Sequence, residues 1–248
     1  MIESPHLRCP GLFITGTDTG VGKTTVTCAI ARRLVEMGLR VGVCKPVATG
    51  CRSDREGLVS PDAEALAHFA DCRLPLDVVN PLRYADPVAP AVAAETERRP
   101  FDMVPIAESL QRLDAQHDLL LVEGIGGLMV PLDESHTVAD LAAWIGYPVV
   151  VVTANRLGTL NHTAMTCQLI RDRGLKLAGL VVNGHDPDST DPAHTTNLLW
   201  LARQNDTKVL ATIPQSSGVA PERAQLPLGI LDAVAMADWQ AICRKQCR

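Results

Sequence analysis

A glycine-rich stretch near the start of the chain has the composition of a phosphate-binding loop. It runs from Thr15 to Thr25 (TGTDTGVGKTT), between a short apolar run and a helical pattern. In the pattern G-x-x-x-x-G-K-S/T, backbone N–H groups and the positive end of the following helix hold phosphate. Here Gly16 stands one residue too early and Thr17 takes the first glycine position, but Gly20 and Gly22 still permit the turn. We therefore expect a phosphate site; the alternative is an ordinary strand-to-helix turn with a surface lysine.

The side chains of this loop indicate which phosphate compound it would bind. Lys23 would reach the β- and γ-phosphates of a nucleotide, and the Thr24 hydroxyl would ligate Mg²⁺. The loop residues expected to bind the nucleotide are Thr19, Gly20, Val21, Gly22, Lys23, Thr24 and Thr25.

Three charged residues outside the loop could form one site with it. Lys45 and Glu123 each end an apolar run, and Asp62 stands at a predicted helix start. A carboxylate such as Glu123, with glycines behind it, is costly to bury unless a cation neutralises it. Two carboxylates and a hydroxyl suit Mg²⁺, so we predict that Thr24, Asp62 and Glu123 hold it. Alternatively, Lys45 is a solvated strand end and Asp62 is a first-turn acid favoured by the helix dipole.

Strand and helix patterns alternate along the chain. Strands are predicted at residues 11–15, 40–44, 118–122, 148–153, 177–182 and 208–212. Helices are predicted at residues 23–37, 62–70, 102–116, 138–145, 159–173, 191–205 and 231–245. Four successive valines in the strand at 148–153 are typical of burial on both faces of a sheet. The alternation predicts an α/β fold of the P-loop NTPase type, a mainly parallel sheet with helices on both faces.

The chain has no internal repeat, low-complexity tract or linker. We therefore expect a single α/β domain over residues 1–248, with a core at about 11–214 and a C-terminal loop and helix at 215–248. Two segments are poorly patterned: residues 75–100 are proline-rich, and residues 215–229 are interpreted as a surface loop.

Polar residues fall directly after several of the predicted strands. They are the loop residues 17–24, Lys45, Glu123, Asn155 with Arg156, and Asn183. The carboxyl ends of parallel strands meet at one edge of a sheet, which is where open α/β sheets bind ligands. These residues therefore predict one convergent site.

Composition limits which ligands and which cellular compartment we expect. The chain has 248 residues, 46% hydrophobic and 3% aromatic, and a net charge of −5. Without a basic run or a stacking motif, nucleic acid is not expected as a ligand. No signal-peptide core or membrane-spanning run is present, so we expect a soluble, cytoplasmic protein. Eight cysteines lack any C-x-x-C pair, which favours reduced thiols over disulfides or a zinc site.

Four motifs together resemble dethiobiotin synthetase. They are Gly16-Thr-Asp-Thr-Gly-Val-Gly-Lys-Thr24, Lys45-Pro-Val-Ala-Thr-Gly50, Val122-Glu-Gly-Ile-Gly-Gly127 and Leu157-Gly-Thr-Leu-Asn-His162. The resemblance covers about residues 12–214. It implies a homodimer that uses ATP, Mg²⁺ and CO₂ or bicarbonate to close a cyclic urea on 7,8-diaminononanoate. The chain departs from the family at Gly20, where many members carry an acid, at Ile125, where alanine is common, and at Thr49, where serine is common.

The resemblance also implies roles for individual residues. Lys23 and Lys45 would offset the charge of the reacting groups, and Thr49 would hydrogen-bond the carbamate or its diamine. Backbone N–H groups of Gly126 and Gly127 would contact the substrate. The adenine edge would be read by Asn183, with a loop at Pro214 closing over it.

The helix predicted to begin near Gly158 could bind a carboxylate through its free N–H groups. The substrate tail ends in a carboxylate, and the resemblance implies that Gly158 and Asn161 receive the tail bound to the partner subunit. The alternative is that Asn161 is an ordinary helix-start residue.

Other functions share parts of this pattern. A partitioning or septum-placing ATPase has a similar loop, but with an extra lysine early in it, which residues 17–19 lack. A glutamine-dependent corrin amidase needs a further glutaminase region. A non-catalytic nucleotide-binding module is the third alternative, and ADP release that depends on diamine and bicarbonate would exclude it.

Overall fold

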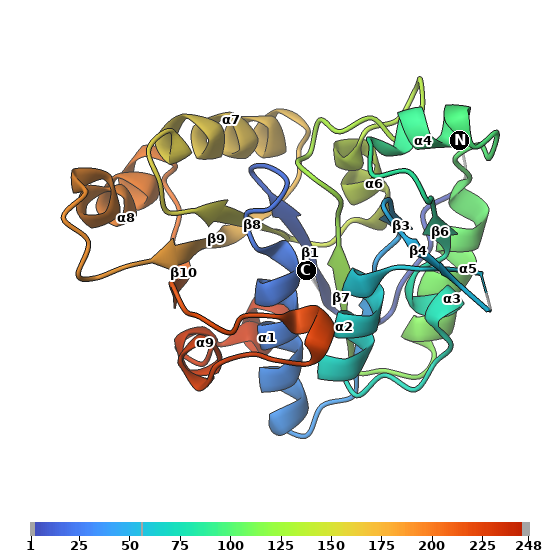
Figure 1. Cartoon of the computed structure of the whole chain (residues 1–248), viewed down its shortest axis with the longest axis horizontal. Helices are drawn as coiled ribbons and strands as arrows, with labels where there is room; N and C mark the ends of the chain where they lie inside the picture. The colour runs from blue at the N-terminus through green and yellow to red at the C-terminus, as the bar shows by residue number, and fades with distance from the viewer. Residues whose placement is uncertain (1–2, 56, 245–248) are drawn as a thin grey trace.

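A six-stranded parallel sheet runs through the molecule (Figure 1). The computed structural model describes residues 3–55 and 57–244. The strands are β1 (Gly11–Gly16), β2 (Val41–Cys44), β7 (Leu119–Glu123), β8 (Val149–Ala154), β9 (Leu177–His185) and β10 (Val209–Pro214). In space their order is β10-β9-β8-β1-β7-β2, with every neighbouring pair parallel. Their carboxyl ends therefore share one edge of the sheet.

Helices cover both faces of the sheet, which confirms the predicted α/β fold. One core includes α1 (Lys23–Glu36), α2 (Pro61–Phe69), α9 (Leu228–Val234) and α10 (Trp239–Arg244). The other includes α5 (Met103–Asp114), α6 (Val138–Ile145), α7 (Thr159–Asp172) and α8 (Pro192–Gln204). Within β8, Val150 and Val152 belong to the first core, and Val149 and Val151 to the second. Successive strand residues point to opposite faces, so this strand needs an unbroken apolar run.

Local signals placed two helix ends correctly. The Asp102 side chain caps α5 by accepting a hydrogen bond from the Val104 N–H at 2.8 Å. The chain leaves α1 through Gly38, whose φ of +84° glycine adopts without strain. In the part of the chain that the structure describes, no helix combines the length and apolar character needed to cross a membrane.

The segment between β2 and α5 contains short elements that the sequence pattern did not predict. β3 (Val47–Ala48) pairs with β6 (Leu82–Arg83), and β4 (Arg52–Asp54) pairs with β5 (Gly57–Val59). Two helices lie in the proline-rich part, α3 (Leu76–Val79) and α4 (Pro90–Thr96). These elements span at most seven residues, too few for a repeating hydrophobic pattern to be recognised.

Five strands end one to three residues later than predicted, and in three of them the extension includes a predicted site residue. Glu123 is the last residue of β7 and pairs with Ile14, and Asn183 lies within β9 and pairs with Ala154. β10 likewise continues to Pro214, beside His185. The sheet ladder therefore holds the backbone of Glu123 and Asn183 in place, whereas the sequence pattern put both residues just after a strand.

The predicted terminal helix at 231–245 is wrong. The chain forms α9 and α10 with a break at residues 235–238, and α9 begins inside the segment interpreted as a loop. The Trp239 indole N–H donates to the Val234 carbonyl at 2.6 Å, and the Asp238 side chain accepts from the Ala241 N–H at 2.9 Å. The chain must turn at residues 235–238 both to bury the Trp239 ring and to cap α10. Lys245 and Cys247 lie outside the described residues.

Candidate active site

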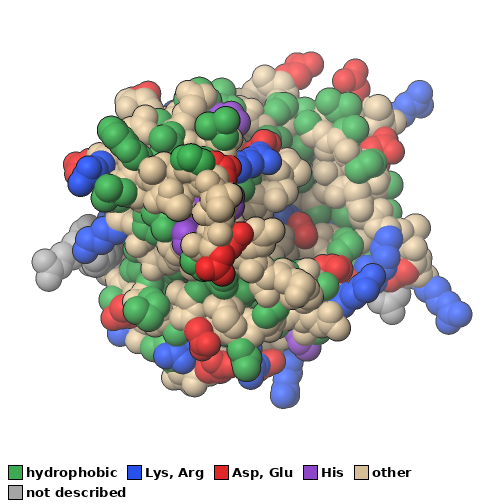
Figure 2. All heavy atoms as spheres, turned by 60° about the vertical axis from the view of Figure 1, so that its left-hand side comes forward, with side chains coloured by type: hydrophobic (Ala, Val, Ile, Leu, Met, Phe, Trp, Pro, Cys, Tyr) green, Lys and Arg blue, Asp and Glu red, His purple; other side chains and the backbone are tan. Residues whose placement is uncertain are grey.

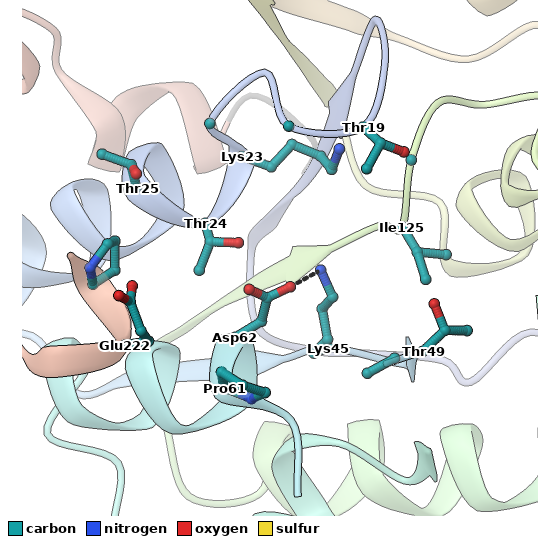
Figure 3. Close-up of a pocket in the computed structure, with 15 residues that line it drawn as sticks. Thr19, Lys23, Thr24, Thr25, Lys45, Thr49, Pro61, Asp62, Ile125 and Glu222 are labelled. Carbon is teal, nitrogen blue, oxygen red and sulfur yellow. Dashed lines mark ion pairs between the residues drawn. The ribbon is translucent and has the colours of Figure 1, made fainter. Parts of the chain in front are cut away.

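A cleft of about 390 Å³ opens at the carboxyl edge of the sheet, between the phosphate loop, α2 and the loop after β7 (Figure 3). Ten predicted site residues line it: Thr19, Gly20, Gly22, Lys23, Thr24, Thr25, Lys45, Thr49, Asp62 and Gly126. In Figure 3 the side chains of Lys45, Asp62 and Thr49 lie close together on one side of the cleft, opposite Lys23. The structure therefore brings most of the predicted residues together.

The back of the phosphate loop is held by Asn183. Its side-chain Nδ2 donates to the Val21 carbonyl at 2.9 Å. Gly22 has a φ of +95°, and a Cβ there would lie 2.0 Å from Asn183 Nδ2. This position therefore requires glycine on both conformational and steric grounds. Val21 itself is buried in the core, and neither Asn183 nor Pro214 is among the residues that line the cleft.

Lys23 folds back over the loop. Its Nζ donates to the Asp18 carbonyl at 2.9 Å, and the residue is 7% exposed. Burial, followed by the nearby charge of Lys45, lowers the pKa of Lys23 to about 8. A phosphate beside the ammonium group would favour the charged form.

Lys45 is the buried centre of a cluster of charged side chains. Its Nζ lies 2.6 Å from Glu123 Oε1 and 2.9 Å from Asp62 Oδ2. It also donates to the Gly124 carbonyl at 3.2 Å. Burial by itself lowers the pKa of Lys45, but the charges of Glu123 and Asp62 outweigh it and raise this pKa above its ordinary value. Lys45 is therefore a fixed cation that opens onto the cleft.

The backbone around Lys45 is held as firmly as the side chain. The Lys45 N–H donates to the Val79 carbonyl at 2.7 Å, and the Asn80 side chain donates to the Lys45 carbonyl at 2.5 Å. The segment 75–100, which looked unpatterned in the sequence, therefore positions a predicted catalytic residue.

Oxygen atoms suited to a hard cation gather beside Lys45. The Thr24 hydroxyl donates to Glu123 Oε1 at 3.0 Å. Among the described residues, the buried Glu123 Oε2 has no hydrogen-bond partner. The Asp62 side chain is 45% exposed. Its partial burial raises the pKa of the carboxyl, but the charge of Lys45 outweighs this and keeps the pKa below the ordinary value. The two carboxylates and the hydroxyl fit the ligand set of Mg²⁺, and the unpaired Glu123 Oε2 is free to bind it.

The glycine loop after β7 packs against the phosphate loop. A Cβ at Gly126 would lie 2.6 Å from Val130 Cγ2, and a Cβ at Gly127 would lie 3.3 Å from the Gly16 carbonyl oxygen. Gly126 lines the cleft, whereas Gly127 lines a neighbouring cavity of about 520 Å³.

The helix α7 lies away from the cleft. Gly158 and Asn161 are exposed and do not line it, whereas His162 lines the neighbouring cavity on the other side of the phosphate loop. Within one chain, the structure therefore does not bring the predicted carboxylate seat to Lys45. The molecular face toward α8 shows hydrophobic and charged side chains interspersed, without a broad basic patch (Figure 2).

Asn155 and Arg156, which follow β8, make contacts within the protein and do not line the cleft. Asn155 is 4% exposed, and its side chain accepts from Asn197 at 3.0 Å and donates to the His194 carbonyl at 3.2 Å. Arg156 instead lies 3.7 Å from the Asp18 carboxylate of the phosphate loop. Asn155 thus supports this edge of the sheet and does not line the cleft.

Five residues that line the cleft were not predicted as site residues: Ala48, Pro61, Ile125, Pro221 and Glu222. The last two come from a short 3₁₀ helix at Pro221–Arg223, inside the segment interpreted as a surface loop. Its return to the phosphate loop depends on the path of the whole C-terminal segment, so no local pattern indicated it.

Comparisons with known proteins show what the chain is similar to in sequence and in fold. A family model described as "AAA domain" matches residues 10–223. The chain is 42% identical over 210 residues to the ATP-dependent dethiobiotin synthetase BioD of Anaeromyxobacter sp. strain K, covering 85% of this chain and 92% of that protein. It is 38% identical to BioD 1 of Escherichia coli K12, covering 82% and 89%. The MinC:MinD cell division complex of Aquifex aeolicus has a similar fold, with a TM-score of 0.61, 12% identity and coverage of 96% and 95%.

Proposed function

The chain belongs to the ATP-dependent dethiobiotin synthetase family, and from that premise we propose that it converts 7,8-diaminononanoate, CO₂ and ATP into dethiobiotin, ADP and phosphate. The observation that carries the proposal is the buried Lys45, paired with Glu123 and Asp62 and facing the phosphate loop. This second cation serves a reaction between two negatively charged groups, which neither a regulatory switch nor a passive nucleotide-binding module carries out.

The reaction needs cations because its partners repel one another. One amine of the diamine takes up CO₂ as a carbamate, and a carbamate oxygen then attacks the γ-phosphorus while ADP leaves. Lys23 and Lys45 offset the negative charge on both groups, and their positions are set before the substrates arrive. The second amine then attacks the carbamoyl carbon, phosphate leaves, and the urea ring closes.

The oxygen cluster completes this arrangement. Thr24, Asp62 and Glu123 hold Mg²⁺, which when bound neutralises phosphate charge. Glu123 has a second role in the same site, because it keeps Lys45 charged and oriented.

Substrate and nucleotide contacts follow from the lining of the cleft. Thr49 is placed beside Lys45 to hydrogen-bond the carbamate or the diamine (Figure 3). Gly126 offers a backbone N–H to the substrate, and Gly127 lies next to it. We infer that the adenine contacts come from Asn183, near the end of β9, and Pro214, the last residue of β10.

The exposed start of α7 supports a homodimer with shared sites. Gly158 and Asn161 lie outside the cleft of their own chain, so they are free to bind the carboxylate of a diamine held in the site of the partner. Such a dimer places each substrate at the subunit interface.

The decisive test of the function is the dependence of ADP formation on substrate. ADP should form only when Mg-ATP, bicarbonate and 7,8-diaminononanoate are all present. ADP formation at the same rate without the diamine would indicate a switch-type ATPase, and no ADP under any condition would indicate a non-catalytic module.

A further inference from the structure

Four threonine hydroxyls meet beneath the phosphate loop. Oγ1 of Thr153, on β8, lies 3.1 Å from Oγ1 of Thr17, the residue that replaces the first glycine of the loop pattern. The same oxygen lies 2.5 Å from Thr159 Oγ1 and 3.0 Å from Thr163 Oγ1, both on α7. Thr153 is therefore the centre of the cluster and joins the loop to α7.

The central hydroxyl is sealed inside the protein. Thr153 and Thr163 are fully buried and Thr159 is 3% exposed, whereas Thr17 is half-buried. None of these four residues is among the described residues that line the nucleotide cleft. Thr153 can therefore affect nucleotide binding only indirectly, and Thr17 is its side-chain contact in the loop.

Hydrogen counting fixes the direction of these bonds. A hydroxyl has one hydrogen to donate and two lone pairs to accept with. Thr163 donates to Thr153, so Thr153 can accept from one more neighbour and donate to the other. Among the described residues, the buried Thr159 hydroxyl contacts only Thr153 Oγ1, so it must donate to that oxygen to avoid an unpaired hydrogen. Thr153 therefore donates to Thr17.

Besides the Lys23 and Arg156 contacts with Asp18, two restraints act on the backbone of the same loop. The Thr17 N–H donates to the Val152 carbonyl at 3.0 Å, and Asn183 binds the Val21 carbonyl at 2.9 Å. The first restraint fixes only the backbone at the entry of the loop. The Thr153 hydroxyl fixes the side chain, and with it the rotation of the turn that leads to Asp18.

We propose that Thr153 is a positioning residue for nucleotide binding, which holds the entry of the phosphate loop in its binding conformation through the Thr17 hydroxyl. The inference rests on the nucleotide site of the proposed function, but it does not depend on which substrate is carboxylated. A loop ordered before binding loses less entropy when the phosphates arrive, so the loss of this bond weakens nucleotide affinity.

The test compares two valine substitutions in the same cluster. Thr153→Val removes the bond to Thr17, whereas Thr163→Val removes a buried hydroxyl from the same cluster and leaves the donation to Thr17 intact. The dissociation constant of a non-hydrolysable ATP analogue with Mg²⁺ is measured by titration calorimetry. Thr153→Val should raise it about tenfold, the equivalent of one hydrogen bond, and Thr163→Val should leave it unchanged.

Two further variants separate positioning from a loss of fold. Thr153→Ser keeps the hydroxyl and should restore the affinity of the parent protein. Thr17→Val removes the same bond from its half-buried end, so it should match Thr153→Val, and the double variant should be no weaker than either single one. An unchanged dissociation constant in Thr17→Val and Thr153→Val, or an equal rise in Thr163→Val, would overturn the proposal. The calorimetry needs no turnover, so its outcome is independent of whether dethiobiotin is the product.

Discussion

The ammonium group of Lys45 lies 2.6 Å from Oε1 of Glu123, and both residues are almost completely buried. A buried charge pair of this kind is costly to break, because removing one partner leaves the other desolvated and unpaired. The pair also points the lysine at the cleft that the phosphate loop borders. Breaking this one contact is therefore expected to lower both the stability of the protein and its catalytic activity.

We expect Lys45→Ala to separate nucleotide binding from turnover. Lys45 lies outside the phosphate loop, so affinity for ATP should stay nearly normal. Turnover should fall roughly a hundredfold or more, as when a preorganised charge partner is removed. Steady-state kinetics and calorimetry measure the two effects, and Lys23→Ala serves as the comparison because it should weaken both. Near-normal turnover in Lys45→Ala would remove Lys45 from the mechanism.

The same variant should also be less stable. Glu123 would lose its buried cation, and the free energy of unfolding should fall by about 3 kcal/mol, the usual scale for a broken buried pair. Urea unfolding of the nucleotide-free protein measures this loss. A stability equal to that of the parent protein would show that the pair is not a structural element.

Replacement of a magnesium ligand should raise the metal requirement. Asp62→Asn keeps the size of the side chain but removes its charge, so half-maximal activity should need a higher Mg²⁺ concentration. Glu64→Gln is the matched control, because Glu64 stands two residues later on α2 and pairs with Arg52. If both variants give the magnesium titration of the parent protein, Asp62 is only a first-turn acid.

The lowered pKa of Lys23 predicts a pH-dependent stability. Between pH 8 and about 10.5, the unfolded chain binds a proton at this lysine that the folded chain does not, so the contribution of Lys23 to the free energy of unfolding rises with pH across this window. Lys23→Met lacks the desolvated charge and should be more stable than the parent at pH 7, by up to about 3 kcal/mol. Urea unfolding of both proteins should show a smaller difference in the free energy of unfolding at pH 9.5 than at pH 7. A constant difference at both pH values would contradict the assignment.

Shared active sites predict complementation between inactive variants. Lys45→Ala and Asn161→Trp should each be inactive, but a co-refolded mixture should regain activity, because some mixed dimers contain one site with both residues intact. Gln168→Trp, an exposed change further along α7, is the control and should stay active. Subunit exchange without recovered activity would place both residues in the same subunit.

The elements that hold the site were predictable because their signals are local. The valine run of β8, the Asp102 cap and Gly38 each act within a few residues, and the structure confirms all three. The convergence of Lys45 with the phosphate loop was predictable for a different reason. Parallel strands place their carboxyl ends together, whatever the details of the loops between them.

Other features of the site depend on contacts that no local pattern encodes. The 3₁₀ helix bearing Glu222 reaches the cleft only because the chain crosses back after β10, and the break before α10 follows from the burial of Trp239. The Thr153 cluster joins residues more than one hundred positions apart in sequence. The domain organisation and the roles of individual site residues stay predictions.

The central claim is tested most directly by following labelled carbon into product. The protein is incubated with Mg-ATP, ¹³C-bicarbonate and 7,8-diaminononanoate, and the product is analysed by mass spectrometry beside an ADP assay. We predict dethiobiotin carrying one ¹³C atom, formed in equal amount to ADP, and strongly reduced formation of both with Lys45→Ala. ADP without labelled cyclic urea, or no labelled product under any order of addition, would contradict the account.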